Sequence, residues 1–180
     1  MSKSYQVLVV GGGAAGLATA ASLKKRDRSL EVAVVEPSDK HYYQPGWTMV
    51  GAGVFTKEDT IKDTDSIWPS DVIRIKDEVI KFDPKNNKVT LGNKTEVGYE
   101  MLVVASGLKL DWEAIEGLSE SLGENGVTSN YRYDLAPYTW ELVQEMNGKN
   151  AIFTQPPMPI KCAGAPQKAM YLSCDHWQKS

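Results

Sequence analysis

The hydrophobic pattern at the start of the chain predicts a strand, a helix and a second strand in immediate succession. Residues 6–10 and 31–35 are apolar runs after a polar first residue, which is typical of strands buried on both faces. Between them, Leu17, Ala20 and Leu23 recur on one side of a helical pattern. Strands joined through a helix lie parallel, so the pattern indicates an α/β fold built on a parallel sheet.

From about residue 72 onwards, the period of the hydrophobic pattern shortens towards two residues, as in a β-strand. Short strands are expected at 72–75, 78–82 and 88–91, with a turn at 83–87, and together they suggest an antiparallel insertion. A longer buried strand follows at 99–107. The small residues at its end, with Gly107 last, would let the chain pass close to a ligand, although small residues also suit plain packing.

The last third of the chain predicts two helices and one more strand. Helical patterns cover 135–146 and 165–177, and the apolar run at 150–154 predicts a strand between them. Residues 111–130 are rich in glycine and predict loops.

Three glycines follow the first strand at the G-x-G-x-x-G spacing. Gly11 permits a tight turn, Gly13 lets the backbone approach a pyrophosphate, and Gly16 lets helix and strand pack closely. Glu36 ends the second strand, 20 residues after Gly16, where a carboxylate accepts hydrogen bonds from ribose hydroxyls. The combination predicts a dinucleotide site, and the alternative is a tight strand–helix turn without a ligand.

The strand predicted at 150–154 is not followed by a glycine motif of this kind. Residues 155–166, which follow it, contain four prolines and no glycine motif. Because proline has no N–H group, such a segment cannot form a phosphate cradle. We therefore expect no nicotinamide dinucleotide site after residues 150–154.

The two cysteines are expected to differ in role. Cys162 follows Lys161 and precedes a predicted helix with Pro166 in its first turn. The start of this helix and the Lys161 ammonium both favour the thiolate form of Cys162. A thiolate is the form that attacks disulfides, sulfur species or an electrophilic flavin. The alternative is a small buried residue at a strand–helix junction. Cys174 lies within the helix, too far along it for a disulfide with Cys162, and is expected to be buried.

Composition narrows the function classes. The 180 residues are 42% apolar and carry a net charge of −3 without a basic run, which argues against a nucleic-acid partner. No apolar stretch approaches the ~20 residues that cross a bilayer. The first strand begins close to Met1, so no targeting segment is expected in this chain.

Four motifs together are distinctive: VVGGGAAG at 9–16, VEPS at 35–38, HYYQP at 41–45 and PIKCAGAPQK at 159–168. With these motifs, nearly the whole chain resembles the amino-terminal part of sulfide:quinone oxidoreductases of the mitochondrial type. These enzymes belong to the FAD-dependent pyridine nucleotide-disulfide oxidoreductase superfamily.

The resemblance implies a domain plan. A Rossmann-like FAD-binding domain, a parallel sheet with an antiparallel crossover, would span 1–115. A linker and helix would follow at 116–148, and a second Rossmann-like domain, which carries the redox cysteine, would begin at 149–180. The implied FAD contacts are Gly11, Gly13, Ala14, Ala15, Gly16, Glu36, Gln44, Val79 and Gly107.

The resemblance also implies an activity. Cys162 would be one of two redox cysteines beside the flavin, with no metal involved. Hydrogen sulfide would be oxidised to a persulfide, and FAD would carry the electrons to ubiquinone or another quinone. A small thiol or sulfite would accept the sulfur. The enzyme would lie peripherally on the mitochondrial inner membrane, or on the cytoplasmic membrane in a bacterium, through a carboxy-terminal region.

Members of this family are longer than this chain. We therefore expect an amino-terminal portion that is incomplete as an enzyme, without the second redox cysteine and the membrane-binding helices. Two alternatives remain open. One is an NAD(P)H-dependent FAD oxidoreductase of the NADH:quinone type, and the other is a non-catalytic, truncated FAD-binding module.

Overall fold

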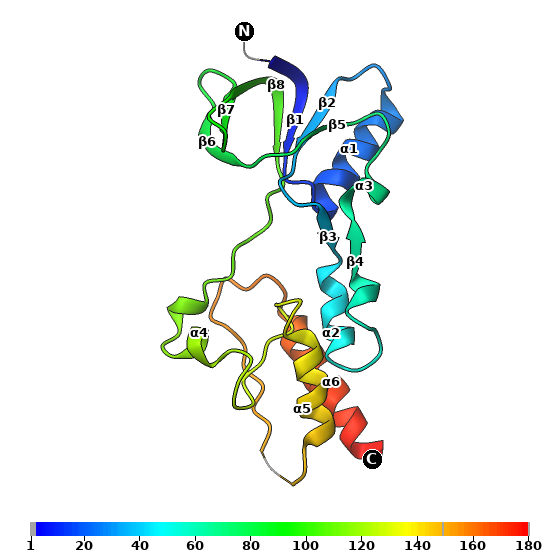
Figure 1. Cartoon of the computed structure of the whole chain (residues 1–180), viewed down its shortest axis with the longest axis vertical. Coiled ribbons are helices and arrows are strands. Elements are labelled where there is room, and N and C mark those ends of the chain that lie inside the picture. The colour runs from blue at the N-terminus through cyan, green and yellow to red at the C-terminus, as the bar shows by residue number, and fades with distance from the viewer. Residues whose placement is uncertain (1–2, 149, 180) are drawn as a thin grey trace. The chain divides into compact units, whose positions relative to one another are not determined.

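The computed structural model in Figure 1 describes residues 3–148 and 150–179. The chain forms two compact units. Unit 1 comprises Met1–Tyr42 and Lys62–Lys109, and unit 2 comprises Tyr43–Ile61 and Leu110–Ser180. Each unit is thus assembled from two separate stretches of sequence.

Unit 1 is built on one sheet and a helix that covers it. Its main elements are β1 (Lys3–Val10), α1 (Ala14–Arg26), β2 (Val32–Val35), β5 (Ile73–Ile75), β6 (Val79–Asp83), β7 (Lys88–Leu91) and β8 (Glu96–Val104). The remaining short elements in this part of the chain are α3 (Thr64–Ile67) and the separate two-stranded sheet of β3 (Lys40–Tyr42) and β4 (Ile61–Asp63).

The six strands lie in the order β5-β2-β1-β8-β7-β6. The first four are parallel, whereas β7 runs antiparallel to β8 and β6 antiparallel to β7 (Figure 1). The predicted α/β, Rossmann-like fold with a parallel sheet and an antiparallel crossover is confirmed. One assignment is wrong, because residues 72–75 belong to the parallel part. Ile73 pairs with Ala33 of β2, and so short a strand carries no sequence signal for its direction.

The continuous apolar runs are explained by burial on both faces of the sheet. Val7 and Val9 pack with Ala20 of α1 on one face, and Leu8 packs with Val89 of β7 on the other. All five are almost completely buried. Full burial of such a side chain contributes about 1.5–3 kcal/mol, so β1 anchors both sides of unit 1.

Unit 2 is mainly helical. Its helices are η1 (Gln44–Gly46), α2 (Trp47–Val50), η2 (Glu58–Thr60), η3 (Trp112–Ala114), α4 (Leu118–Ser121), α5 (Ala136–Glu145) and α6 (Gly164–Lys179). A hydrogen bond connects α6 to α5: the Nε1 of Trp177 on α6 donates to the Val143 carbonyl of α5 at 2.8 Å. Gly53 lies so close to α5 that a Cβ there would be 2.3 Å from the Trp140 ring, which ties the 43–61 stretch to this helix.

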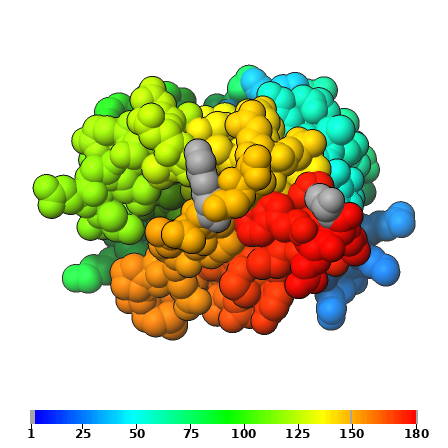
Figure 2. Space-filling model, turned by 90° about the horizontal axis from the view of Figure 1, so that it is seen from below, coloured from blue at the N-terminus to red at the C-terminus, as the bar shows by residue number. Residues whose placement is uncertain are grey.

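Residues 150–154 are not a strand, and that prediction is wrong. Ile152 is 85% exposed, and in Figure 2 the orange segment that follows α5 lies at the surface beside the red α6. A strand needs a neighbouring strand that forms hydrogen bonds with its N–H and C=O groups. Within the described part of unit 2, no strand pairs with this segment.

Candidate functional site

The turn between β1 and α1 requires glycine at its two ends. Gly11 has φ of 100°, and a Cβ there would lie 2.4 Å from the Ala105 carbonyl oxygen. A Cβ on Gly16 would lie 1.8 Å from the Gly11 carbonyl oxygen. Since both obstacles are backbone atoms, neither position accepts a larger residue without displacement of the turn.

The middle of the same turn is open. A Cβ on Gly13 would meet no atom within 4 Å, and Ala14 and Ala15 are exposed. The first backbone hydrogen bond of α1 is donated by the Leu17 N–H to the Gly13 carbonyl at 3.0 Å. The earlier N–H groups lie at the positive end of a 13-residue helix whose first turn holds no acidic residue. This arrangement fits a phosphate-bearing ligand.

Glu36 is attached to this turn by its carboxylate. Its Oε2 accepts from the Gly12 N–H at 2.7 Å, and its Oε1 accepts from the Ser38 N–H at 2.8 Å. Gly12 itself has no room for a side chain, because a Cβ would lie 2.7 Å from the Glu36 Cβ. A carboxylate has about four acceptor positions, so two remain for ribose hydroxyls.

The end of β8 lies against the glycine turn. The Ala105 N–H donates to the Val10 carbonyl at 2.8 Å. Gly107 follows with φ of 73°, and a Cβ there would meet no atom within 4 Å. Val79, at the start of β6, is half-buried and packs against the core on the β7 face. A dinucleotide such as FAD fits the groups in unit 1, since an open glycine, free N–H groups and an anchored acid occur together.

Gln44 and Cys162, although far apart in sequence, lie in one cluster of unit 2. The Lys161 ammonium donates to the Gln44 Oε1, and Cys162 lies two residues before the start of α6. Sequence analysis missed Tyr131, whose hydroxyl donates to the Cys162 carbonyl at 3.5 Å. The tyrosine is separated from the cysteine by 31 residues, and no motif connects the two.

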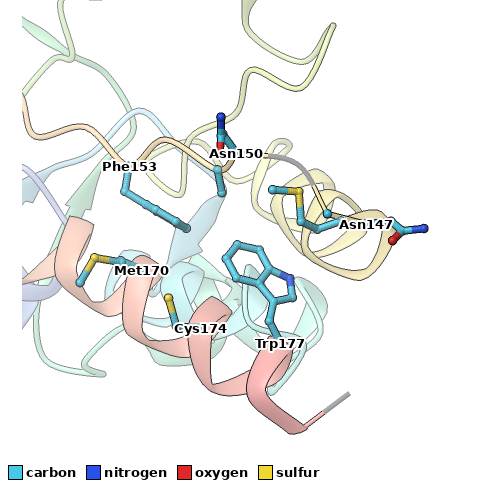
Figure 3. Close-up of a pocket in the computed structure, with 9 residues that line it drawn as sticks. Asn147, Asn150, Phe153, Met170, Cys174 and Trp177 are labelled. Atoms are coloured by element: carbon cyan, nitrogen blue, oxygen red, sulfur yellow. The ribbon is translucent and has the colours of Figure 1, made fainter.

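Cys174 lies elsewhere in unit 2. It is only half-buried, and it lines a cavity of about 780 Å³ with Phe153, Met170 and Trp177 (Figure 3). Both cysteines are free in the structure. Within residues 3–148 and 150–179, no cluster of three His, Cys, Asp or Glu side chains could hold a metal. None of the helices described is both long and apolar enough to cross a bilayer.

Comparison with known proteins shows which family shares this sequence. Residues 5–142 match the pyridine nucleotide-disulphide oxidoreductase family. The chain is 44% identical over 176 residues to a mitochondrial sulfide:quinone oxidoreductase of Dictyostelium discoideum and 43% identical over 176 residues to the Mus musculus one. These alignments cover 97% and 98% of this chain, but only 39% of either relative.

Among solved structures, the sulfide:quinone oxidoreductase of Aquifex aeolicus superimposes with a TM-score of 0.63 at 26% identity. That match covers 80% of this chain and 32% of the other. The resemblance expected from the sequence motifs is thereby confirmed. With a matched family model over most of its length and the glycine turn in place, the chain belongs to the pyridine nucleotide-disulphide oxidoreductase family.

Proposed function

We propose that this chain is the FAD-binding and cysteine-bearing portion of a sulfide:quinone oxidoreductase. The main support is the identity of 43–44% to two enzymes of that name across nearly the whole chain. We further propose a division into an FAD-binding domain at 1–115, a linker and helix at 116–148, and a second domain from 149.

In this proposal unit 1 holds the cofactor. The N–H groups of Ala14, Ala15 and Gly16 face the pyrophosphate, and Glu36 binds the ribose. Gly11 and Gly13 would keep the turn open to the phosphates, Gly107 would let the chain pass close to the cofactor at the end of β8, and Val79 would offer its backbone to the adenine. When bound, FAD accepts two electrons from a sulfur group and gives them to a quinone.

Cys162 supplies the sulfur chemistry. Hydrosulfide attacks a sulfur bridge between Cys162 and a second cysteine, one S–S bond breaks, and a new S–S bond forms as a persulfide. The cysteine that leaves is released as a thiolate, and a small thiol or sulfite then removes the sulfane sulfur from the other cysteine. The two cysteine thiolates re-form their S–S bond and release two electrons, which FAD would accept when bound. Two electrons and two protons convert the quinone to a quinol, so each sulfide oxidised reduces one quinone.

The partners and the location follow from the same relatives. The enzymes of Dictyostelium discoideum and Mus musculus are both named mitochondrial, so we propose a mitochondrial enzyme with sulfide and ubiquinone or another quinone as substrates. Peripheral contact with the inner membrane belongs to the proposal and would involve a region that the alignment does not cover.

The proposal is tested by adding sulfide anaerobically to the complete, FAD-loaded protein, which would supply the second cysteine, and following the visible flavin absorbance. Loss of absorbance with sulfide, and none with NADH, is the expected result. A Cys162→Ser variant should bind FAD and lose the sulfide response, whereas Cys174→Ser should keep it. Bleaching by NADH instead would favour a nicotinamide-dependent flavin reductase.

A further inference from the structure

Glu36, the acid that directly follows β2, is oriented by the short turn after it. Its Oε1 accepts from the Ser38 N–H at 2.8 Å, and its Oε2 accepts from the Gly12 N–H at 2.7 Å. The first of these bonds joins residues only two positions apart, so the direction of the carboxylate depends on where the backbone of Ser38 lies. Groups that fix Ser38 therefore also orient the acid.

The Ser38 carbonyl is fixed by two donors from other elements of unit 1. Arg74 of β5 donates to it through Nη2 at 2.8 Å, and the hydroxyl of Thr64, the first residue of α3, donates to it at 3.1 Å. Thr64 is almost completely buried, and its N–H donates to the Asp39 carbonyl at 2.9 Å. Two consecutive carbonyls of the turn are thus held by residues distant in sequence.

The guanidinium of Arg74 has a well-defined position. The side chain is 16% exposed, and its Cζ lies 5.3 Å from the centroid of the Trp68 ring. Nη1 donates to the Asp65 carboxylate, and Nη2 donates to that of Asp39 at 3.1 Å. The Nε has no acceptor in the described part of the chain, so the two terminal nitrogens set the direction of the group. Because both carboxylates are exposed, these ion pairs contribute little to stability, and the geometry favours a role in orienting the turn.

We propose that Arg74 is a positioning residue for Glu36, acting through the backbone of Ser38, with Thr64 as a second support of the same carbonyl. The inference rests on the proposed function only in that Glu36 is taken as the acceptor of the ribose hydroxyl of FAD. A planar guanidinium presents its donors in a fixed fork, which a lysine ammonium does not reproduce. The acid is then oriented before the cofactor binds, and less ordering is needed on binding.

The amide proton resonance of Gly12 measures the positioning without any ligand. A charge-assisted hydrogen bond to a carboxylate is short and moves such a resonance downfield. Arg74→Met keeps the apolar stem and removes the donors, so the Gly12 resonance should move upfield as the bond to Glu36 weakens. Thr64→Val removes the other donor and should move it in the same direction. Lys76→Met is the matched control and should leave it in place, because Lys76 directly follows β5 and donates to an exposed carboxylate of the turn.

The preference for a ribose measures the consequence for binding. ADP and 2′-deoxy-ADP differ by one hydroxyl, so the ratio of their dissociation constants reports the bond to Glu36, whereas a general loss of stability weakens both alike. In the flavin-free full chain we expect a ratio of about tenfold, the size of one hydrogen bond to a charged acceptor. Glu36→Gln should lower the ratio. Arg74→Met should lower it to about threefold, as expected when that bond is retained only in part, and Lys76→Met should not change it.

Two results would overturn the proposal. One is a Gly12 resonance that stays in place in both Arg74→Met and Thr64→Val. The other is a parental ribose preference in both variants when Glu36→Gln lowers that preference. If Glu36→Gln itself leaves the preference unchanged, the result counts against the proposed cofactor site, and the Gly12 resonance still decides whether Arg74 orients the acid.

Discussion

Substitution of Gly16 by alanine tests whether α1 packs on the glycine turn as closely as the structure shows. Within a helix, Gly→Ala ordinarily stabilises by up to about 1 kcal/mol. Here the new methyl group would lie 1.8 Å from the Gly11 carbonyl oxygen and 3.3 Å from a Val9 methyl group. Gly11 has little freedom to retreat, because its N–H donates to the Val35 carbonyl at 2.9 Å.

The magnitude follows from these opposing effects. Overpacking costs about 1–3 kcal/mol when side chains can adjust. In Gly16→Ala the atom in the way belongs to the backbone, which adjusts less easily, so we expect a cost at or above the upper end of this range. After the gain in helix propensity is subtracted, we expect a net loss of about 2 kcal/mol or more in the free energy of unfolding.

Gly13→Ala is the matched comparison in the same turn. Its Cβ would meet no atom within 4 Å, and φ of −70° is allowed for any residue. We expect a loss of at most about 1 kcal/mol, from the weaker N-cap preference of alanine. If the open space at Gly13 receives the pyrophosphate, as proposed, the added methyl group would occupy part of it, and the affinity for FAD should fall by about tenfold, which corresponds to about 1.4 kcal/mol.

Urea unfolding gives the free energies, and hydrogen exchange in β1 reports specifically on unit 1. An FAD titration completes the comparison. Parental stability in Gly16→Ala would contradict the close packing of turn and helix. Equal loss in Gly13→Ala would contradict the open space in front of the turn, and unchanged FAD affinity there would remove the turn from the cofactor site.

Three further predictions concern other parts of the chain. Glu36→Gln replaces a charged acceptor of the Gly12 N–H by a neutral one, so the free energy of unfolding should fall by about 1 kcal/mol in urea titrations; no change would mean that the bond is unimportant. The hydrogen bond and charge of Lys76 lower the pKa of Asp39 below its ordinary 3.8. The contribution of the Asp39 carboxylate to the stability of the fold is therefore complete above pH 3.8 and is lost as the pH falls through the lower pKa of the folded state. Thermal melting of Asp39→Asn should therefore show a shallower decline in acid than the parent, and an identical decline would refute the linkage. Ile152→Lys should alter the free energy of unfolding by less than about 0.5 kcal/mol, and amides at 150–154 should exchange rapidly, whereas protection there would indicate a paired strand.

Much of unit 1 could be predicted from sequence because its signals are local. Continuous apolar runs correspond to strands with two buried faces, and the glycine spacing corresponds to a turn whose shape depends on a few adjacent residues. The position of Glu36 at the end of β2 follows from the length of one strand–helix–strand unit. These features need no knowledge of distant parts of the chain.

Other features depended on tertiary contacts. The direction of β5 was decided by pairing with β2, and residues 150–154 remained without strand structure because a strand forms only where a neighbour accepts its backbone hydrogen bonds. The carboxylate bond to Gly12 joins residues 24 apart, and the contact of Lys161 with Gln44 joins residues 117 apart. The sequence by itself determined which residues have the chemistry for a nucleotide turn and a reactive thiol. Only the folded chain decided which partners hold them, because such contacts arise when loop closure brings distant segments together.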